Sequence, residues 1–351
     1  MSFLMRARVA TTAAVLRDLE SAETRVQREA IAAAPGVARE EGSEARARIV
    51  SVLARILGSE APAMVRGDAA FALADLGARE ALPALIAAAE SDHDLVRELA
   101  VSALGELGDA EGLAVVERAL RDEQPEVRFQ AIVAYPRVAK GAVAPDRIWA
   151  TLRRGLDDAD EEVEVRAAEA CAELAAGDPL PPAIADRLAR LAGDTAVGQE
   201  LRLAAATALG DSGDARGAPV LLAVVDGSMK TDERRTFIAL ELCGELGLRA
   251  AIPTLRAAVF GLRARFGDPS RRTTALLALC RLGDEEAIAV VLDEIERGSY
   301  ARRAVALGIA GHARLTVARG AIEQLRGRES LADPEAVEDA LASLEGGSKS
   351  P

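Results

Sequence analysis

Apolar residues recur along this chain at the spacing of one face of an α-helix. Between residues 96 and 108 they stand at positions i, i+4, i+7, i+8 and i+11, which places them in one stripe on a helix. The stripe consists of Val96, Ala100, Ala103, Leu104 and Leu107. Gly108 follows, where many helices end in a left-handed residue, and apolar positions resume at Leu113. The segment therefore predicts a hairpin of two helices.

The first helix of this hairpin has the pattern V-R-x-x-A-x-x-A-L-x-x-L-G, which recurs along almost the whole chain. We align the copies on the residue after the Val and call it the reference position. The reference positions are Gln27, Arg66, Arg97, Arg128, Arg166, Arg202, Thr236, Arg272 and Arg302. Self-similarity at a period of about 30 to 40 residues, with two helical stripes per unit, predicts an α-solenoid.

Each copy of the pattern predicts one first helix. These helices are expected near 26–38, 65–77, 96–108, 127–139, 165–177, 201–213, 235–247, 271–283 and 301–313, with a C-terminal capping helix at 333–345. We expect residues 1–345 to form a single solenoid. Residues 346–351, GGSKSP, are expected to be a disordered tail.

The motif is fullest in Val65–Leu85, VRGDAAFALADLGAREALPAL, and in Leu201–Leu221, LRLAAATALGDSGDARGAPVL. These residues resemble HEAT repeats of the short bacterial type called PBS-lyase HEAT-like, and the resemblance covers residues 24–330. It implies an all-α, right-handed α-α superhelix of about nine helical hairpins with terminal capping helices.

The same resemblance implies that the first helices line the concave face. It also implies a ladder between repeats, in which an Asp ahead of each first helix pairs with the Arg. On this basis the expected pairs are Asp92 with Arg97, Asp122 with Arg128, and Asp157 with Arg166.

Composition narrows the possible functions. Half of the 351 residues are apolar but only 3% are aromatic, so the core must consist mainly of Ala, Leu and Val. A net charge of −13 argues against nucleic acid as a partner, because phosphate contacts need a basic surface. No apolar run is long enough to insert into a membrane. The Arg-rich, Lys-poor composition is typical of a GC-rich bacterial genome.

Residues for catalysis or for a metal are scarce. The three cysteines, Cys171, Cys243 and Cys280, are far apart and fit no disulfide or metal framework, which favours a reducing, cytoplasmic location. Of the two histidines, His93 is expected in a solvated turn and His312 in a position that other repeats fill with a buried Leu. We therefore expect no enzyme activity, cofactor, metal site or small-molecule substrate.

One face of the first helices is a candidate protein-binding surface. Positions five and nine after each reference position point away from the buried stripe, so stacked repeats would arrange them in rows. The candidate partner-binding residues are Phe71, Asp75, Glu106, Arg137, Asp211, Glu241, Glu245 and Arg281. In the fifth repeat the same offsets give Cys171 and Ala175. The alternative interpretation is an ordinary solvated face.

A second candidate surface is basic. Residues 249–281 contain seven arginines and a single acid, Asp268. Its candidate residues are Arg256, Arg263, Arg265, Arg271 and Arg272. Such a patch would attract an acidic protein surface, and less readily DNA, because the rest of the chain is acidic.

The sequence thus predicts a non-catalytic protein-binding scaffold that presents an extended concave surface to a protein partner. Two alternatives stay open. One is a subunit of a bilin-attaching lyase, which the name of the repeat type suggests. The other is a HEAT-like DNA-binding protein that uses the basic patch at 249–281. The sequence does not identify the partner, the pathway or the oligomeric state.

Overall fold

A computed structural model describes residues 11–261 and 268–345, and every regular element in these ranges is a helix. The α-helices of the first half are α1 (Thr12–Leu19), α2 (Thr24–Glu40), α3 (Ser43–Leu57), α4 (Ala63–Asp75), α5 (Leu82–Ala88), α6 (Asp94–Leu107), α7 (Leu113–Ala119), α8 (Pro125–Ala139), α9 (Pro145–Gly155) and α10 (Glu161–Ala175). The second half comprises α11 (Pro182–Gly193), α12 (Gln199–Asp211), α13 (Ala218–Val225), α14 (Glu233–Glu245), α15 (Ile252–Phe260), α16 (Pro269–Arg281), α17 (Glu285–Arg297), α18 (Tyr300–His312), α19 (Arg319–Glu323) and α20 (Pro334–Glu345).

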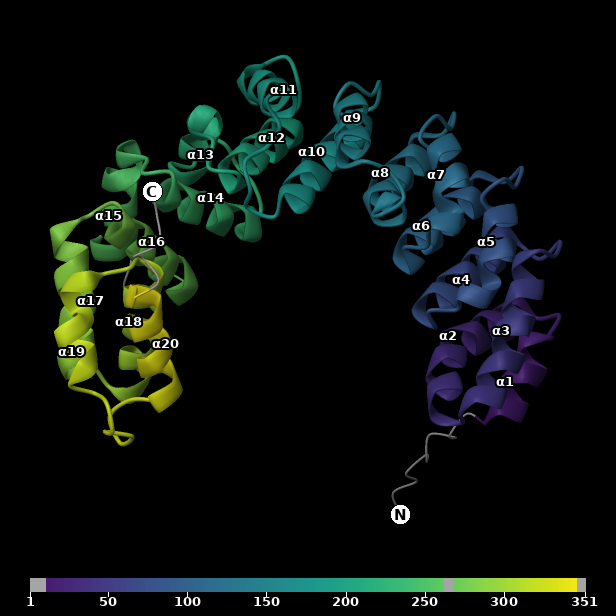
Figure 1. Ribbon diagram of the computed structural model, residues 1–351, viewed down its shortest axis with the longest axis horizontal. Helices are drawn as coiled ribbons and strands as arrows, with labels where there is room; N and C mark the ends of the chain where they lie inside the picture. The colour runs from purple at the N-terminus through teal and green to yellow at the C-terminus, as the bar shows by residue number, and fades with distance from the viewer. Residues whose placement is uncertain (1–10, 262–267, 346–351) are drawn as a thin grey trace. The chain divides into compact units, whose positions relative to one another are not determined.

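The chain divides into two compact units, residues 1–174 (unit one) and residues 175–351 (unit two). In unit one the first helices α2, α4, α6 and α8 pack against one another in sequence, and α3, α5, α7 and α9 form the second helices of the hairpins (Figure 1). In unit two the first helices α12, α14, α16 and α18 alternate in the same way with α13, α15, α17 and α19, and α20 packs on α18. The predicted all-α solenoid is confirmed.

Helices run through all nine predicted first-helix segments and the predicted cap. Most begin two residues before the predicted start, as α4 does at Ala63 and α6 at Asp94. The predicted disordered tail at 346–351 lies outside the described residues. Among the helices that are described, none combines the length and apolarity needed to cross a membrane.

Close helix packing explains why the chain uses so few aromatic residues. A Cβ atom on Gly105 of α6 would lie 2.7 Å from the Cβ of Ala134 in α8, so these helices touch almost backbone to backbone. A Gly that faces an Ala permits such an approach, and Leu and Val fill the space on either side. Leu104 and Val101, for example, are completely buried.

The ninth repeat has a different register from the one predicted. Its left-handed residue is Arg314, with φ of 51°, where the preceding repeat has Gly283 with φ of 77°. In the preceding repeat the reference position, Arg272, stands eleven residues before the left-handed residue. Eleven residues before Arg314 stands Arg303, not Arg302, and Arg303 is only 6% exposed. The prediction for His312 was therefore wrong: His312 lies one position earlier in the pattern and is exposed.

The fifth repeat is also shifted. Val163 is buried and begins a buried stripe that continues through Ala167, Ala168 and Cys171. Val163 therefore holds the position of the motif's Val, and Glu164 holds the reference position instead of Arg166. The sequence Val-Glu-Val-Arg offers two valines, and the one chosen by the prediction is not the buried one. Cys171 consequently belongs to the core and not to the predicted surface row.

Candidate functional site

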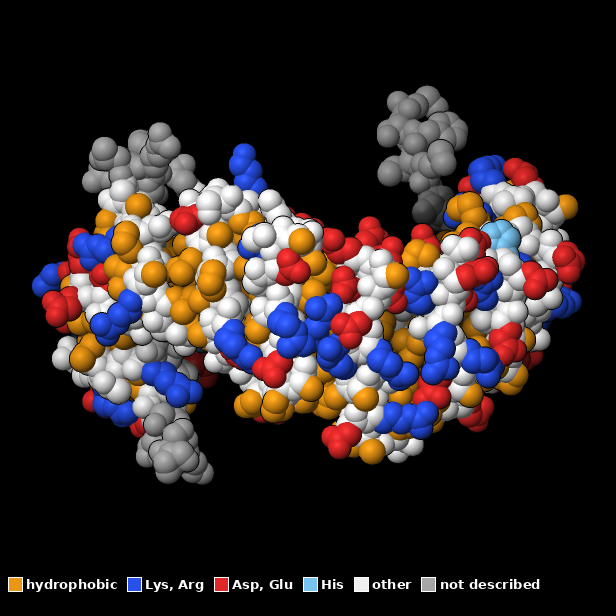
Figure 2. Space-filling view, turned by 90° about the horizontal axis from the view of Figure 1, so that it is seen from above, with side chains coloured by type: hydrophobic (Ala, Val, Ile, Leu, Met, Phe, Trp, Pro, Cys, Tyr) orange, Lys and Arg blue, Asp and Glu red, His pale blue; other side chains and the backbone are white. Residues whose placement is uncertain are grey.

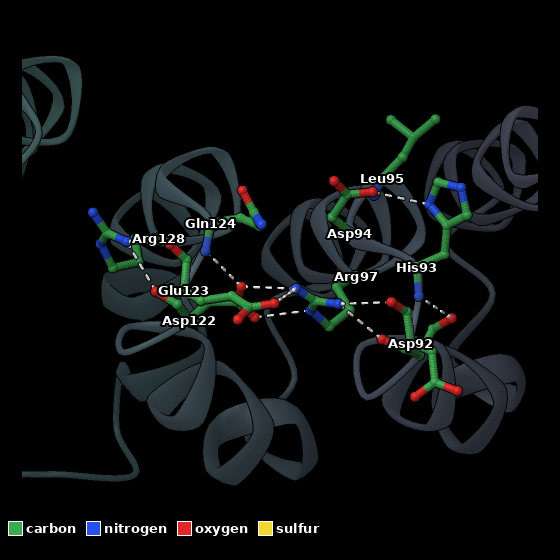
Figure 3. A network of polar contacts seen from close by, with 10 residues as sticks. Asp92, His93, Asp94, Leu95, Arg97, Asp122, Glu123, Gln124 and Arg128 are labelled. Atoms are coloured by element: carbon green, nitrogen blue, oxygen red, sulfur yellow. Dashed lines mark hydrogen bonds and ion pairs between the residues drawn. The ribbon is translucent and has the colours of Figure 1, made fainter.

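A ladder of ion pairs joins adjacent repeats in unit one. The Arg97 guanidinium donates from Nε to Asp122 Oδ2 at 2.8 Å and from Nη2 to Asp122 Oδ1 at 2.9 Å (Figure 3). Both side chains are only 13% exposed. Arg128 makes the same two-pronged contact with Asp158, at 3.0 and 2.8 Å. Two such bonds fix both the distance and the orientation between repeats.

The ladder exists, but its predicted pairing was wrong. Each Asp stands six residues ahead of a reference position and reaches back to the Arg of the preceding repeat. The Arg of its own repeat instead donates to backbone carbonyls, as Arg128 does to the carbonyl of Asp122 at 2.9 Å. Asp92 likewise offers Arg97 only its backbone oxygen, at 3.4 Å. Asp157 pairs with Arg153, and Arg166 pairs with Glu169 and Glu173 of its own helix.

The backbone contact of the reference side chain recurs in several repeats. Gln27 donates to the Leu19 carbonyl at 2.9 Å, Arg66 to Leu57 at 2.9 Å, and Arg303 to Ile295 at 2.8 Å. All three carbonyls lie at the C-terminal end of a helix, where carbonyls have no partner within the helix. The reference position therefore caps the preceding helix, and this role is structural.

The exposed part of the first helices contains an open groove in unit one, between α2 and α4. Its volume is about 810 Å³. The apolar residues that line it are Ile31, Ala32, Pro35, Phe71 and Ala72. Phe71, which was predicted to bind a partner, is 68% exposed. An exposed Phe beside an apolar groove is costly in water and is typical of a docking surface.

Charged residues border this groove and are paired with one another. Arg28 of α2 donates to Asp68 of α4 at 2.5 Å, and Arg25 pairs with Glu29 at 2.8 Å. Asp75, the second predicted residue here, accepts from Arg39 at 2.7 Å. Because these pairs balance one another, the border of the groove carries almost no net charge.

The next two predicted residues form a pair of their own. Arg137 of α8 donates to Glu106 of α6 at 2.7 Å, and both side chains are about half exposed. The contact is an exposed ion pair, which contributes little to stability and can be exchanged for a partner's charges.

The four predicted residues of unit two lie together. Arg281 of α16 approaches Glu245 at 3.0 Å and Glu241 at 3.6 Å, both on α14. Asp211 of α12 is close enough for the charges of both glutamates to act on it. Burial, followed by these two charges, raises the pKa of Asp211. Two of these three carboxylates pair with the Arg281 guanidinium, so this part of the surface is acidic.

The basic patch is weaker than its sequence suggests. Arg256 donates to Asp284 at 2.7 Å, pairs with Glu286 and lies over the Phe260 ring at 5.3 Å. Arg272 donates to the Val259 carbonyl at 3.3 Å. Arg271 is exposed, and Arg263 and Arg265 lie outside the described residues. The acids that follow in the sequence therefore neutralise part of the patch.

The cysteine thiols lie in the core of the protein. All three cysteines are free and buried. Burial raises the pKa of Cys171 to about 12 and that of Cys243 to about 11, so both thiols are protonated at neutral pH. Within the described ranges, no group of three or more His, Cys, Asp or Glu side chains could hold a metal ion.

Sequence reasoning missed the α2 side of the groove, including Arg28, Ile31 and Pro35. The first repeat has Gln27 in place of Arg, and Pro35 within its helix, so its motif is weak. The helix nevertheless runs unbroken from Thr24 to Glu40. A weak repeat motif next to a clear one was the available signal that a surface departs from the pattern there.

Several comparisons with known proteins bear on this architecture. A family model described as HEAT repeats matches residues 50–136, and one described as PBS lyase HEAT-like repeat matches residues 201–227. No curated protein matches the sequence.

Solved structures with the same fold are distant in sequence. The karyopherin Kap121p bound to Nup53p has a TM-score of 0.51 and 16% identity, over 95% of this chain and 41% of Kap121p. YibA of E. coli has a TM-score of 0.54 and 18% identity, over 77% of this chain and 92% of YibA. The chain thus spans about two fifths of the length of Kap121p, and the likeness extends to the fold alone. The protein is a helical solenoid with HEAT repeats at residues 50–136 and a PBS lyase HEAT-like repeat at residues 201–227.

Proposed function

We propose that this protein is a non-catalytic scaffold that binds a protein partner on the exposed face of its first helices. The groove between α2 and α4 carries the proposal. The groove has an apolar lining, contains Phe71 with a side chain that is 68% exposed, and is bordered by charged residues that pair with one another. This combination suits a partner segment that inserts an apolar side chain and exchanges ion pairs at the edges.

Two further observations support a protein partner. The acidic surface formed by Asp211, Glu241 and Glu245 would favour basic side chains on a partner that contacts unit two. Kap121p, which has the same fold, has been solved bound to the proteins Nup53p, Ste12p and Pho4p. A preformed solenoid surface lowers the entropic cost of binding, because the repeats are already ordered.

Affinity capture followed by direct binding of the captured protein tests this proposal. Phe71→Ala removes the exposed ring and leaves the core untouched, so folding should not change. The matched control is Val317→Ala, since Val317 is 67% exposed, belongs to unit two and does not line the groove. We expect the partner to bind at least tenfold more weakly to Phe71→Ala, and equally to wild type and Val317→Ala. Equal affinity for all three proteins would contradict the groove as the docking site.

A second set of variants tests the charged part of the surface. Replacing Asp75, Glu106, Asp211 and Glu245 together by Ala removes four of the predicted residues, all of them on the first helices. Circular dichroism checks that the helices persist. We expect weaker binding with a smaller dependence on salt, because the removed charges are screened by ions in the wild type. Unchanged affinity and salt dependence would exclude these carboxylates from the interface.

A further inference from the structure

A second, smaller pocket lies elsewhere in unit one, between the second helices α7 and α9 and the first helix α8. Its volume is about 270 Å³, slightly below the range of about 300–1,000 Å³ that is usual for small-molecule sites. Its charged lining consists of Glu117, Arg121, Arg128, Arg147, Arg154 and Asp158. Four arginines face two carboxylates there, in a chain whose net charge is −13. Figure 2 shows Arg and Lys side chains spread along one face of the molecule, with Asp and Glu side chains among them.

The carboxylates are already engaged. Asp158 holds Arg128 in the ladder, and both side chains are at most 16% exposed. Glu117 accepts from Arg147 at 2.7 Å. Arg121 and Arg154 make no contact with a carboxylate in the described ranges. The two excess positive charges of the pocket therefore reside on Arg121 and Arg154.

The preceding repeat shows what usually occupies these positions. Between α5 and α7, Glu90 pairs with Arg118. Arg121 stands seven residues before its reference position, as Glu90 does, and Arg154 stands ten residues before its own, as Arg118 does. The Glu–Arg pair of one repeat is thus an Arg–Arg pair in the next. Like charges that line one small pocket repel each other unless an anion lies between them.

The pocket also positions one of these arginines. Thr151 is 3% exposed, and its hydroxyl donates to the Arg147 carbonyl at 3.0 Å. The same hydroxyl accepts from Nη2 of Arg154 at 3.2 Å. A buried hydroxyl therefore restrains the Arg154 guanidinium, which lowers the entropic cost of binding an oxyanion.

We infer that this pocket binds a phosphate group between Arg121 and Arg154. Guanidinium groups match the geometry of phosphate oxygens. A phosphate monoester carries a charge of about −1.5 to −2 at neutral pH, which balances the excess of two arginines. The phosphate can be free or attached to a phosphorylated side chain, and both have the same chemistry at this site. The site is separate from the groove, so it does not depend on the proposed partner surface.

Arg121→Glu is the sharpest test, because it restores the Glu–Arg pair of the preceding repeat. Isothermal titration uses two probes, inorganic phosphate and an N-acetylated O-phosphoserine amide, at constant ionic strength. We expect both probes to bind the wild type, and binding to Arg121→Glu to fall at least tenfold. In phosphate-free chloride buffer we also expect Arg121→Glu to unfold at a higher temperature than the wild type.

The control is the double variant Arg79→Ala/Arg118→Ala, which lowers the net charge by the same two units outside the pocket. It should bind phosphate as the wild type does, and Arg121→Gln should lose binding if Arg121→Glu fails to fold. Binding of inorganic phosphate but not of the phosphoserine probe would identify free phosphate as the ligand. Tighter binding of the phosphoserine probe would identify a phosphorylated side chain as the ligand. Equal phosphate binding by wild type and Arg121→Glu, or none by the wild type, would overturn the inference.

Discussion

Breaking the ladder should destabilise unit one far more than breaking an exposed ion pair. Asp122→Ala removes two charge-assisted hydrogen bonds to Arg97, at 2.8 and 2.9 Å. It also removes a bond from the backbone N–H of Gln124 at 3.0 Å. Breaking a buried pair costs about 3–5 kcal/mol, and the 13% exposure of both side chains reduces this to about 3 kcal/mol.

The matched control is Glu106→Ala, which removes the exposed partner of Arg137. The Glu106 side chain is 59% exposed, so its loss should cost less than about 1 kcal/mol. A double-mutant cycle with Arg97→Met separates the pairwise energy from the loss of the Gln124 bond.

Urea unfolding followed by circular dichroism measures these differences. Hydrogen exchange in the same variants identifies which repeats open, because repeat arrays need not unfold in a single step. For Asp122→Ala we expect faster exchange in α6 and α8. If Asp122→Ala and Glu106→Ala differ by less than about 0.5 kcal/mol, the ladder is not a principal source of stability and the reasoning fails.

Three further predictions follow from the same structure. Burial raises the pKa of Asp122, but its bonds to Arg97 and Gln124 and the charges of Arg97 and Arg128 outweigh this and lower it overall. The ladder's contribution to the free energy of unfolding should therefore be complete above the unfolded-state pKa of about 3.9 and be lost as pH falls through the folded-state pKa. Acid unfolding of the Asp122→Asn variant should lack this pH-dependent loss of stability. Gly105→Ala should lower the free energy of urea unfolding by about 1–3 kcal/mol, because its Cβ would lie 2.7 Å from that of Ala134. Gly36→Ala in α2, whose Cβ would meet nothing within 4 Å, should raise that free energy by about 0.5–1 kcal/mol. Equal effects of the two variants would refute the close α6–α8 contact. Arg314→Gly should raise stability by about 1 kcal/mol, because Arg314 has φ of 51°, and a loss would contradict the assigned turn.

The repeat period predicted the fold because each hairpin repeats the same apolar stripe. It failed at Arg166 and Arg302, where two candidate residues stand one or two positions apart and burial alone decides between them. The sequence also could not predict with which repeat each Asp of the ladder pairs. An Asp ahead of an Arg in sequence indicates that a pair exists, but loop geometry sends Asp122 to the preceding repeat.

The candidate surface was predicted only in part. Offsets from the reference position correctly identified Phe71 as exposed, because helical geometry fixes which face it occupies. The groove beside Phe71 needed a second helix, α2, whose motif is weak. The phosphate pocket needed a comparison between repeats, since Arg121 is informative only beside the Glu90 that holds its place one repeat earlier.

Photo-crosslinking from position 71 tests the central claim most directly. Replacing Phe71 by photoreactive benzoylphenylalanine keeps an aromatic ring at the groove, and the same replacement at Val317 is the control. The scaffold proposal predicts that irradiation of cells yields a covalent adduct with one protein partner from position 71, and none from position 317. Adducts from position 317 with none from position 71 would contradict it and move the docking site away from the groove.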